Sequence, residues 1–185
     1  MTKSTELKES KNNNNLLSYS SEKSKKPVFK IFYDFNKHLY YLKDLGVGYG
    51  TFYKIEEEVI IKQNSIINIG ESYLIFYFQN ENNEEDLFLK IYSNEGEYPP
   101  IIIKNKNKIN QVGRSDKCDV YIKDKMLSIV HCILFYIDNN WYIKDGNENG
   151  NKSTNGTWFF TNEETEIKEG MKFKSNSCNF LCKFQ

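Results

Sequence analysis

The sequence predicts an all-β chain folded as an antiparallel sandwich, and three observations support this prediction. From Val28 onward, short apolar runs alternate with polar pairs, and Gly, Asn, Asp or Pro stands in most of the gaps. No stretch shows a helical period over three turns. The chain contains no alanine and is rich in Ile, Tyr and Phe, which lowers helix propensity and raises strand propensity.

Each expected strand ends at a turn signal or a polar pair. The strands are expected at residues 28–35, 39–43, 51–55, 59–62, 66–69, 73–78, 87–92, 101–104, 109–112, 120–122, 129–137, 141–144, 157–160, 166–167, 171–174 and 179–184. Such short strands with turn signals every ~8–12 residues are typical of a sandwich.

Composition divides the chain into three expected parts. Residues 1–26 are polar and rich in Lys, Ser and Asn, so we expect a disordered arm. A polar break at 79–86 then separates a partial β unit, 27–80, from a complete domain, 86–185. An internal repeat supports this division, because residues 40–44, 50–52 and 67–69 are echoed in the same order by 141–145, 156–158 and 171–173.

The charge balance and the cysteine pattern exclude several classes of partner. With 25 basic and 25 acidic side chains the formal net charge is zero, so we expect neither nucleic acid nor an acidic membrane as partner. No apolar run reaches the ~18 residues of a membrane span, and the N-terminus lacks a signal-peptide core. We therefore expect an intracellular protein, cytoplasmic or nuclear, with reduced thiols. The four cysteines form no CxxC pair and the two histidines do not stand at zinc spacing, so neither a metal nor a cofactor is expected.

The chain has a single arginine, Arg114, among its 25 basic residues. Arginine grips phosphate or carboxylate through a planar fork, whereas lysine is a point charge. The alternative is an ordinary surface salt bridge. The residues around Arg114 decide between the two.

Three short motifs follow one another in the last hundred residues. They are Gly113-Arg114, then Ser128 with His131 three residues later, and finally Thr154-Asn155-Gly156-Thr157. A phosphate dianion needs several donors converging from separate loops, and a sandwich gathers its loops at one end. In this order and spacing, the motifs resemble the forkhead-associated (FHA) family.

The resemblance implies a SMAD/FHA-like β-sandwich that docks onto phosphothreonine in partner proteins. It implies that Arg114 and Ser128 hold the phosphate, that Thr154 contacts it or lies beside it, and that Asn155 bonds the main chain of the bound peptide. The remaining matched positions are expected to be structural, with His131 buried below the loops; they are Gly113, His131, Gly156 and Thr157.

One position departs from the family pattern. The residue after Ser128 is often polar or basic in the family, but here it is Ile129, which donates no hydrogen bond. We therefore expect a weaker or more selective site. Lys117, Lys125 or Lys152 could supplement it, although a solvated surface charge is the ordinary role of such a lysine.

The front unit lacks the same motifs. Tyr49 stands where the second copy has Asn155, and neither a Gly-Arg pair nor a Ser-x-x-His string precedes it. The GxGxG string at 46–50 leads into a strand, so we interpret it as a turn and not as a nucleotide loop. Half a sandwich exposes an apolar face. Residues 28–80 are thus expected to pack on the second unit, to self-associate with another chain, or to be poorly ordered.

Two other functions compete with phosphopeptide binding. His131 and Cys132 are adjacent, but consecutive strand residues point to opposite faces, so they cannot form a nucleophile pair, and no enzyme activity is expected. The chain could instead be the non-catalytic fragment of a larger signalling enzyme. The other rival is a phosphate-independent scaffold or self-association module.

Overall fold

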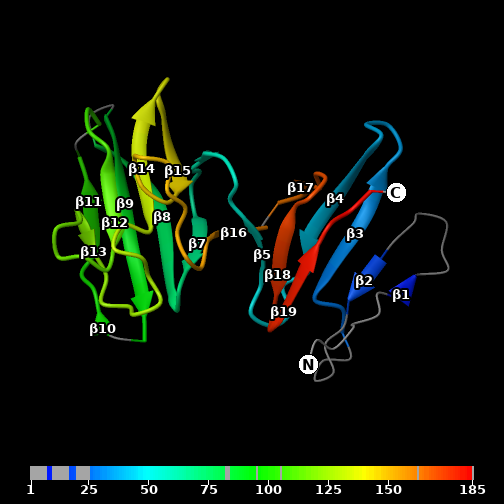
Figure 1. Cartoon of the computed structure of the whole chain (residues 1–185). Coiled ribbons are helices and arrows are strands. Elements are labelled where there is room, and N and C mark those ends of the chain that lie inside the picture. The colour runs from blue at the N-terminus through cyan, green and yellow to red at the C-terminus, as the bar shows by residue number, and fades with distance from the viewer. Residues whose placement is uncertain are drawn as a thin grey trace. The chain divides into compact units, whose positions relative to one another are not determined.

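The computed structural model describes residues 8–9, 17–19, 26–81, 84–94, 96–104, 106–161 and 163–184. These residues form nineteen strands and no helix, which confirms the all-β, antiparallel sandwich predicted from the sequence (Figure 1). Within the described residues, nothing has the length and apolarity of a membrane-spanning helix.

The chain divides into two compact units. One is continuous and covers Lys54–Phe159. The other is split, because it combines Met1–Tyr53 with Phe160–Gln185. We refer to them as the continuous unit and the split unit.

The continuous unit is a sandwich of two sheets. One sheet has the order β10-β9-β8-β7-β16, with β11 on the other side of β9, and the second has the order β13-β12-β14-β15-β6. The strands are β6 (Val59–Ile60), β7 (Ser65–Ile69), β8 (Ser72–Glu81), β9 (Glu84–Ser93), β10 (Gly96–Glu97), β11 (Ile101–Ile103), β12 (Asn110–Gly113), β13 (Val120–Tyr121), β14 (Cys132–Ile137), β15 (Asn140–Asp145) and β16 (Thr157–Phe160). All pairings in it are antiparallel except the parallel pair β12–β13.

Alternating side chains from both sheets build the core of this unit. In β8, Leu74 and Phe76 are fully buried, and in β15, Trp141 and Ile143 are at most 1% exposed. The residues between them remain partly or fully exposed, as the period of two in a half-buried strand requires. The sandwich thereby provides a rigid base for its connecting loops.

The split unit joins the front of the chain to its end. Its strands are β1 (Lys8–Glu9), β2 (Leu17–Tyr19), β3 (Phe29–Asp34), β4 (Leu39–Asp44), β5 (Thr51–Lys54), β17 (Thr165–Glu166), β18 (Lys172–Ser175) and β19 (Cys178–Leu181). They form the orders β1-β2-β3-β4-β17 and β5-β18-β19. Phe29 lies at the centre of its core, with ring centroids 5.1 Å from Phe173 and 5.2 Å from Phe180.

The two units use the same strand register. The continuous unit contains the hairpin β7–β8, which comes from the front of the chain, and the split unit contains the hairpin β18–β19, which comes from its end. In the continuous unit, β16 pairs Thr157 with Ile69 of β7. In the split unit, β5 pairs Thr51 with Ser175 of β18. Because Gly50-Thr51 and Gly156-Thr157 are the repeated residues, β7 and β18 occupy equivalent places. Ile69 thereby corresponds to Ser175, two residues beyond the match of 67–69 with 171–173 that the sequence suggested.

The strands β6 and β17 show the same equivalence. Pairing of β6 with β15 places Tyr142 opposite Ile60. Pairing of β17 with β4 places Tyr41 opposite Glu166. The segment from β6 to β8 therefore completes the continuous unit as the segment from β17 to β19 completes the split unit.

This arrangement differs from the sequence-based division at 27–80 and 86–185. The expected break at 79–86 is the end of a hairpin, in which β8 and β9 pair through to Glu81 and Glu84 (Figure 1). The apolar face of the front strands is covered by rear strands, because Phe29 and Leu42 share a core with Ile167 and Phe173. Local sequence cannot distinguish two equivalent hairpins. The sequence-based division therefore grouped each hairpin with the strands that precede it in the chain.

The expected disordered arm, 1–26, falls mostly outside the described residues. Two short strands within it are described, and β2 pairs with β3, with Leu17 opposite Ile31. This pairing differs from the expectation for residues 17–19. The physical reason is that the edge of β3 offers unpaired backbone groups, which an apolar residue in an extended segment can reach.

Candidate functional site

The site lies where three loops of the continuous unit meet, and a close backbone contact holds the first two together. Arg114 N donates to the carbonyl of Ser128 at 3.1 Å, and Ser115 N donates to that of Ile129 at 3.3 Å. A Cβ on Gly113 would lie 2.2 Å from the Ile129 carbonyl oxygen. Only glycine permits this approach, so Gly113 brings the loop of Arg114 against the loop of Ser128.

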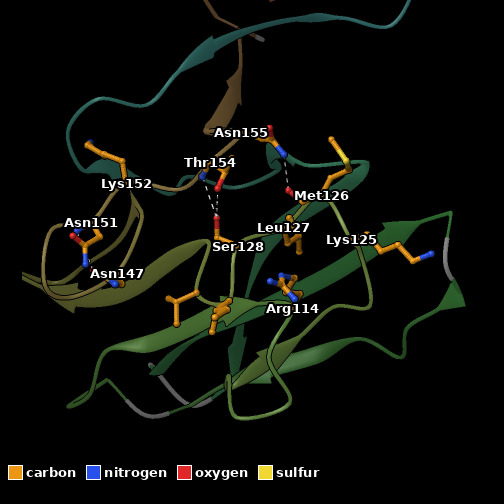
Figure 2. Close-up of a pocket in the computed structure, with 12 residues that line it drawn as sticks. Arg114, Lys125, Met126, Leu127, Ser128, Asn147, Asn151, Lys152, Thr154 and Asn155 are labelled. Atoms are coloured by element: carbon orange, nitrogen blue, oxygen red, sulfur yellow. Dashed lines mark hydrogen bonds between the residues drawn. The ribbon is translucent and has the colours of Figure 1, made fainter.

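The side chain of Arg114 is exposed at the end of β12 and lines a pocket of about 590 Å³. No hydrogen bond or ion pair to another described residue engages its guanidinium. Ser128, Thr154 and Asn155 line the same pocket (Figure 2). The structure therefore brings together the four residues named from the sequence, and the only arginine is not used in a salt bridge between described residues.

Ser128 connects the second loop to the third. Thr154 N donates to Ser128 Oγ at 3.0 Å, and the two hydroxyl oxygens lie 3.4 Å apart (Figure 2). With its oxygen accepting from the main chain, the Ser128 hydroxyl is oriented to donate elsewhere, toward Thr154 Oγ1 or into the pocket.

Asn155 adds a second link between these loops. Its side-chain Nδ2 donates to the Met126 carbonyl at 2.7 Å, and its main-chain carbonyl accepts from Trp158 Nε1 at 2.9 Å. Gly156 follows with a φ of 76°, the left-handed conformation that the Asn-Gly pair favours. The turn thus fixes where Asn155 stands at the rim of the pocket.

His131 lies fully buried beneath the loops. Its Nδ1 accepts from Ser128 N at 3.2 Å, and its Nε2 lies 3.1 Å from the carbonyl oxygen of Gly156. A carbonyl only accepts, so we assign the proton to Nε2 and leave Nδ1 as the acceptor. A neutral imidazole therefore joins the second and third loops from below.

Burial lowers the pKa of His131 below its ordinary value of 6.5, although the Gly156 carbonyl, Asp145 and Asp124 act in the opposite direction. The unfolded chain then binds more protons than the folded chain just below pH 6.5. The contribution of His131 to stability is complete above that pH and decreases as the pH falls toward the folded pKa.

We predict that the free energy of unfolding decreases between pH 7.5 and 5.5 by at most about 1.4 kcal/mol per pH unit from this group. Urea denaturation at several pH values measures it. His131→Gln should lose this part of the slope, whereas His38→Gln, at the exposed histidine, should retain it. A slope that survives in the His131 variant would contradict the prediction.

A buried carboxylate anchors the third loop, and sequence reasoning did not assign it a role. Asp145 Oδ1 accepts from Ser153 Oγ at 2.5 Å and from Thr157 Oγ1 at 2.7 Å, while Oδ2 accepts from Ser153 N at 3.1 Å. Ser153 Oγ in turn accepts from Gly156 N at 2.9 Å. The signal that could have found it is the Asp that ends the corresponding strand in each copy, Asp44 in β4 and Asp145 in β15, with hydroxyl residues following Asp145.

The remaining pocket residues set its charge and its apolar rim. Lys125 and Lys152 line the pocket, whereas Lys117 is not among the lining residues. Among the described residues that line it, none is acidic, so the pocket is electropositive. Ile129, 62% exposed, contributes an apolar wall where the family often has a donor.

The pair His131 and Cys132 offers no nucleophile. The Cys132 thiol is fully buried, and this burial raises its pKa far above the ordinary range, which disfavours the thiolate. None of the four cysteines forms a disulfide. No cluster of three His, Cys, Asp or Glu side chains suited to a metal occurs in the part of the chain that the structure describes.

Residues 110–174 match the family model of the FHA domain. The match begins at the first residue of β12 and covers all three loops of the site. FHA domains are phosphopeptide-binding modules, generally without catalytic activity, so the match supports a protein-interaction role with a protein partner. Neither the curated proteins nor the solved structures contain a match to this chain.

Proposed function

We propose that the continuous unit binds phosphothreonine-containing segments of partner proteins, without catalysis, through the loops that carry Arg114, Ser128 and Thr154-Asn155. One observation supports this proposal above the others. The only arginine of the chain stands exposed in a pocket without acidic residues among its described lining, and no described carboxylate pairs with it. A guanidinium that no described residue engages, in the same pocket as the Ser128 and Thr154 hydroxyls, is suited to a phosphate dianion.

Each of the four residues has a definite part in this proposal. Arg114 gives two parallel hydrogen bonds to the phosphate, and Ser128 donates its hydroxyl. Thr154 contacts the phosphate or lies beside it, since its hydroxyl is 3.4 Å from that of Ser128. Asn155 keeps the loops in register through Met126 and presents the rest of its amide to the peptide main chain.

We also propose that the front strands are a degenerate, partial FHA-like copy that binds no phosphate. In the shared register Thr51 corresponds to Thr157, so Tyr49 takes the place of Asn155. Tyr49 is 82% exposed and has no side-chain amide to offer at that place. The charge-carrying motifs occur in the second copy alone.

Calorimetric titration tests the proposed function, with a degenerate phosphothreonine peptide pool against the same pool after phosphatase treatment. Binding of the phosphorylated pool and none of the treated pool is the expected result. A pull-down with the phosphorylated pool, followed by mass spectrometry, would then identify the flanking residues. Equal binding of both pools would instead favour the phosphate-independent scaffold.

A further inference from the structure

The two hairpins β7–β8 and β18–β19 are equivalent in register but are not interchangeable in their turns. Pairing of Ile69 with Ser72 closes the first hairpin, and pairing of Ser175 with Cys178 closes the second. Gly70 and Asn176 occupy the same turn position, with φ of 53° and 52°. The backbone conformation is therefore shared, and the difference lies in the side chains.

Asp124 receives the turn of the first hairpin. Its Oδ2 accepts from Ser72 Oγ at 2.8 Å and from Glu71 N at 2.9 Å. Its Oδ1 accepts from Met126 N at 2.8 Å. Asp124 is 3% exposed and Ser72 is fully buried, so these charge-assisted bonds form away from water. One carboxylate thus ties the β7–β8 turn to the loop that ends at Ser128.

The turn of the second hairpin could not make these contacts. A Cβ on Gly70 would lie 2.8 Å from Asp124 Oδ2, so the Cβ of Asn176 in that place would collide with the carboxylate. Cys178, in the place of Ser72, offers a thiol, which is a weak donor. Seating β18–β19 beside β16 would therefore leave the buried carboxylate of Asp124 underbonded, which is costly.

The second hairpin carries its own complementary residue. Asn176 Oδ1 accepts from Tyr49 N at 3.0 Å in the split unit. Gly48 lies against it, because a Cβ there would be 2.4 Å from the same oxygen. Gly70 has no side chain with which to replace this bond. Each turn thus matches the loop that it meets.

We infer that Asp124, with Gly70 and Ser72, selects β7–β8 over the equivalent β18–β19 hairpin and positions the loop that carries Ser128. Gly70 and Ser72 are then positioning residues of the anion site, although they precede the family match by about forty residues. The selection of β7–β8 over β18–β19 is inferred from the contacts of Asp124 alone. The consequence for phosphopeptide binding rests on the proposed function. Met126 connects the hairpin selection with the anion site. Its N–H donates to Asp124 Oδ1, and its carbonyl accepts from Asn155 Nδ2.

The test uses Ser72→Ala and a matched control, Ser65→Ala, in the full chain. Ser65 is also a buried serine of the same hairpin, 4% exposed, but its hydroxyl accepts from Lys62 N at 2.8 Å and does not serve Asp124. We expect Ser72→Ala to weaken binding of the phosphothreonine peptide pool about fivefold, by loss of one hydrogen bond to a charged group. Ser65→Ala should leave the affinity within about twofold.

Amide hydrogen exchange by NMR provides a readout that needs no ligand. Exchange at Met126 N should accelerate in Ser72→Ala, and in Gly70→Asn combined with Ser72→Cys, which gives the first turn the residues of the second. Exchange at Met126 N should be the same in Ser65→Ala as in the parent when the two are compared at equal unfolding free energy. Equal exchange at Met126 in all variants would overturn the inference. If the parent binds no phosphopeptide, the proposed function fails and Met126 exchange alone decides the selection.

Discussion

Arg114→Ala is expected to weaken phosphothreonine peptide binding by about 30- to 150-fold, which corresponds to about 2–3 kcal/mol. The reason is the loss of two parallel charge-assisted bonds to the phosphate, with no other arginine available in the chain to replace them. The unfolding free energy should change by less than about 0.5 kcal/mol, since the side chain is exposed and makes no bond to a described residue. Isothermal titration with the phosphorylated pool measures the affinity.

Two further variants separate charge from geometry. Arg114→Lys keeps the charge and loses the planar fork, so about tenfold weakening is expected. Lys117→Ala removes a neighbouring exposed charge that does not line the pocket, and should leave affinity within about twofold. If Arg114→Ala binds the phosphorylated pool as tightly as the parent, the assignment of the anion site is wrong.

Gly113→Ala is expected to lower the unfolding free energy by about 3 kcal/mol and to abolish measurable phosphopeptide binding. The added Cβ would lie 2.2 Å from the Ile129 carbonyl oxygen and 2.9 Å from its carbonyl carbon. Backbone cannot move aside as a flexible side chain does, so the loops of Arg114 and Ser128 must separate. Thermal denaturation and the same titration measure the two effects.

The matched control is Gly150→Ala, in the third loop of the same unit. Gly150 has a φ of 83°, but a Cβ there meets no atom within 4 Å. Backbone strain alone should cost about 1–2 kcal/mol, and binding should persist. A Gly113 variant that is no less stable than the Gly150 variant would show that the loops tolerate separation.

Local sequence patterns were sufficient to predict the class of fold and most of the strands, although not β1, β2 and β10. The β3–β4 hairpin and β15 follow from alternating apolar residues bounded by Asn, Asp or Gly, which is information within a few residues of each strand. The grouping of Arg114, Ser128 and Asn155 came from motif spacing and from the resemblance to a known family. What those motifs could not convey is that Asn155 bonds the Met126 carbonyl and that Gly113 acts by allowing close approach to the Ile129 backbone.

The ends of β8 and β9 were missed for a related reason. Residues 79–86 are polar, so their sequence resembles a linker, yet Gln79 pairs with Asp86 and Glu81 with Glu84. Backbone pairing with a neighbouring strand stabilises these residues, and the hydrophobic pattern does not report it. A polar strand end and a polar linker have the same composition, so the sequence pattern placed a domain boundary where the structure has the end of the β8–β9 hairpin.

The sequence by itself was enough to predict most of the strands and the loops that carry the proposed anion-binding motifs, and it suggested two related copies. The tertiary structure alone decided which hairpin completes which copy. That choice depends on a contact between Ser72 and Asp124, 52 residues apart, and on the absence of a Cβ at Gly70. A local sequence pattern cannot distinguish two hairpins that have the same pleat and register. Only the side chains that each hairpin contacts in the folded chain distinguish them.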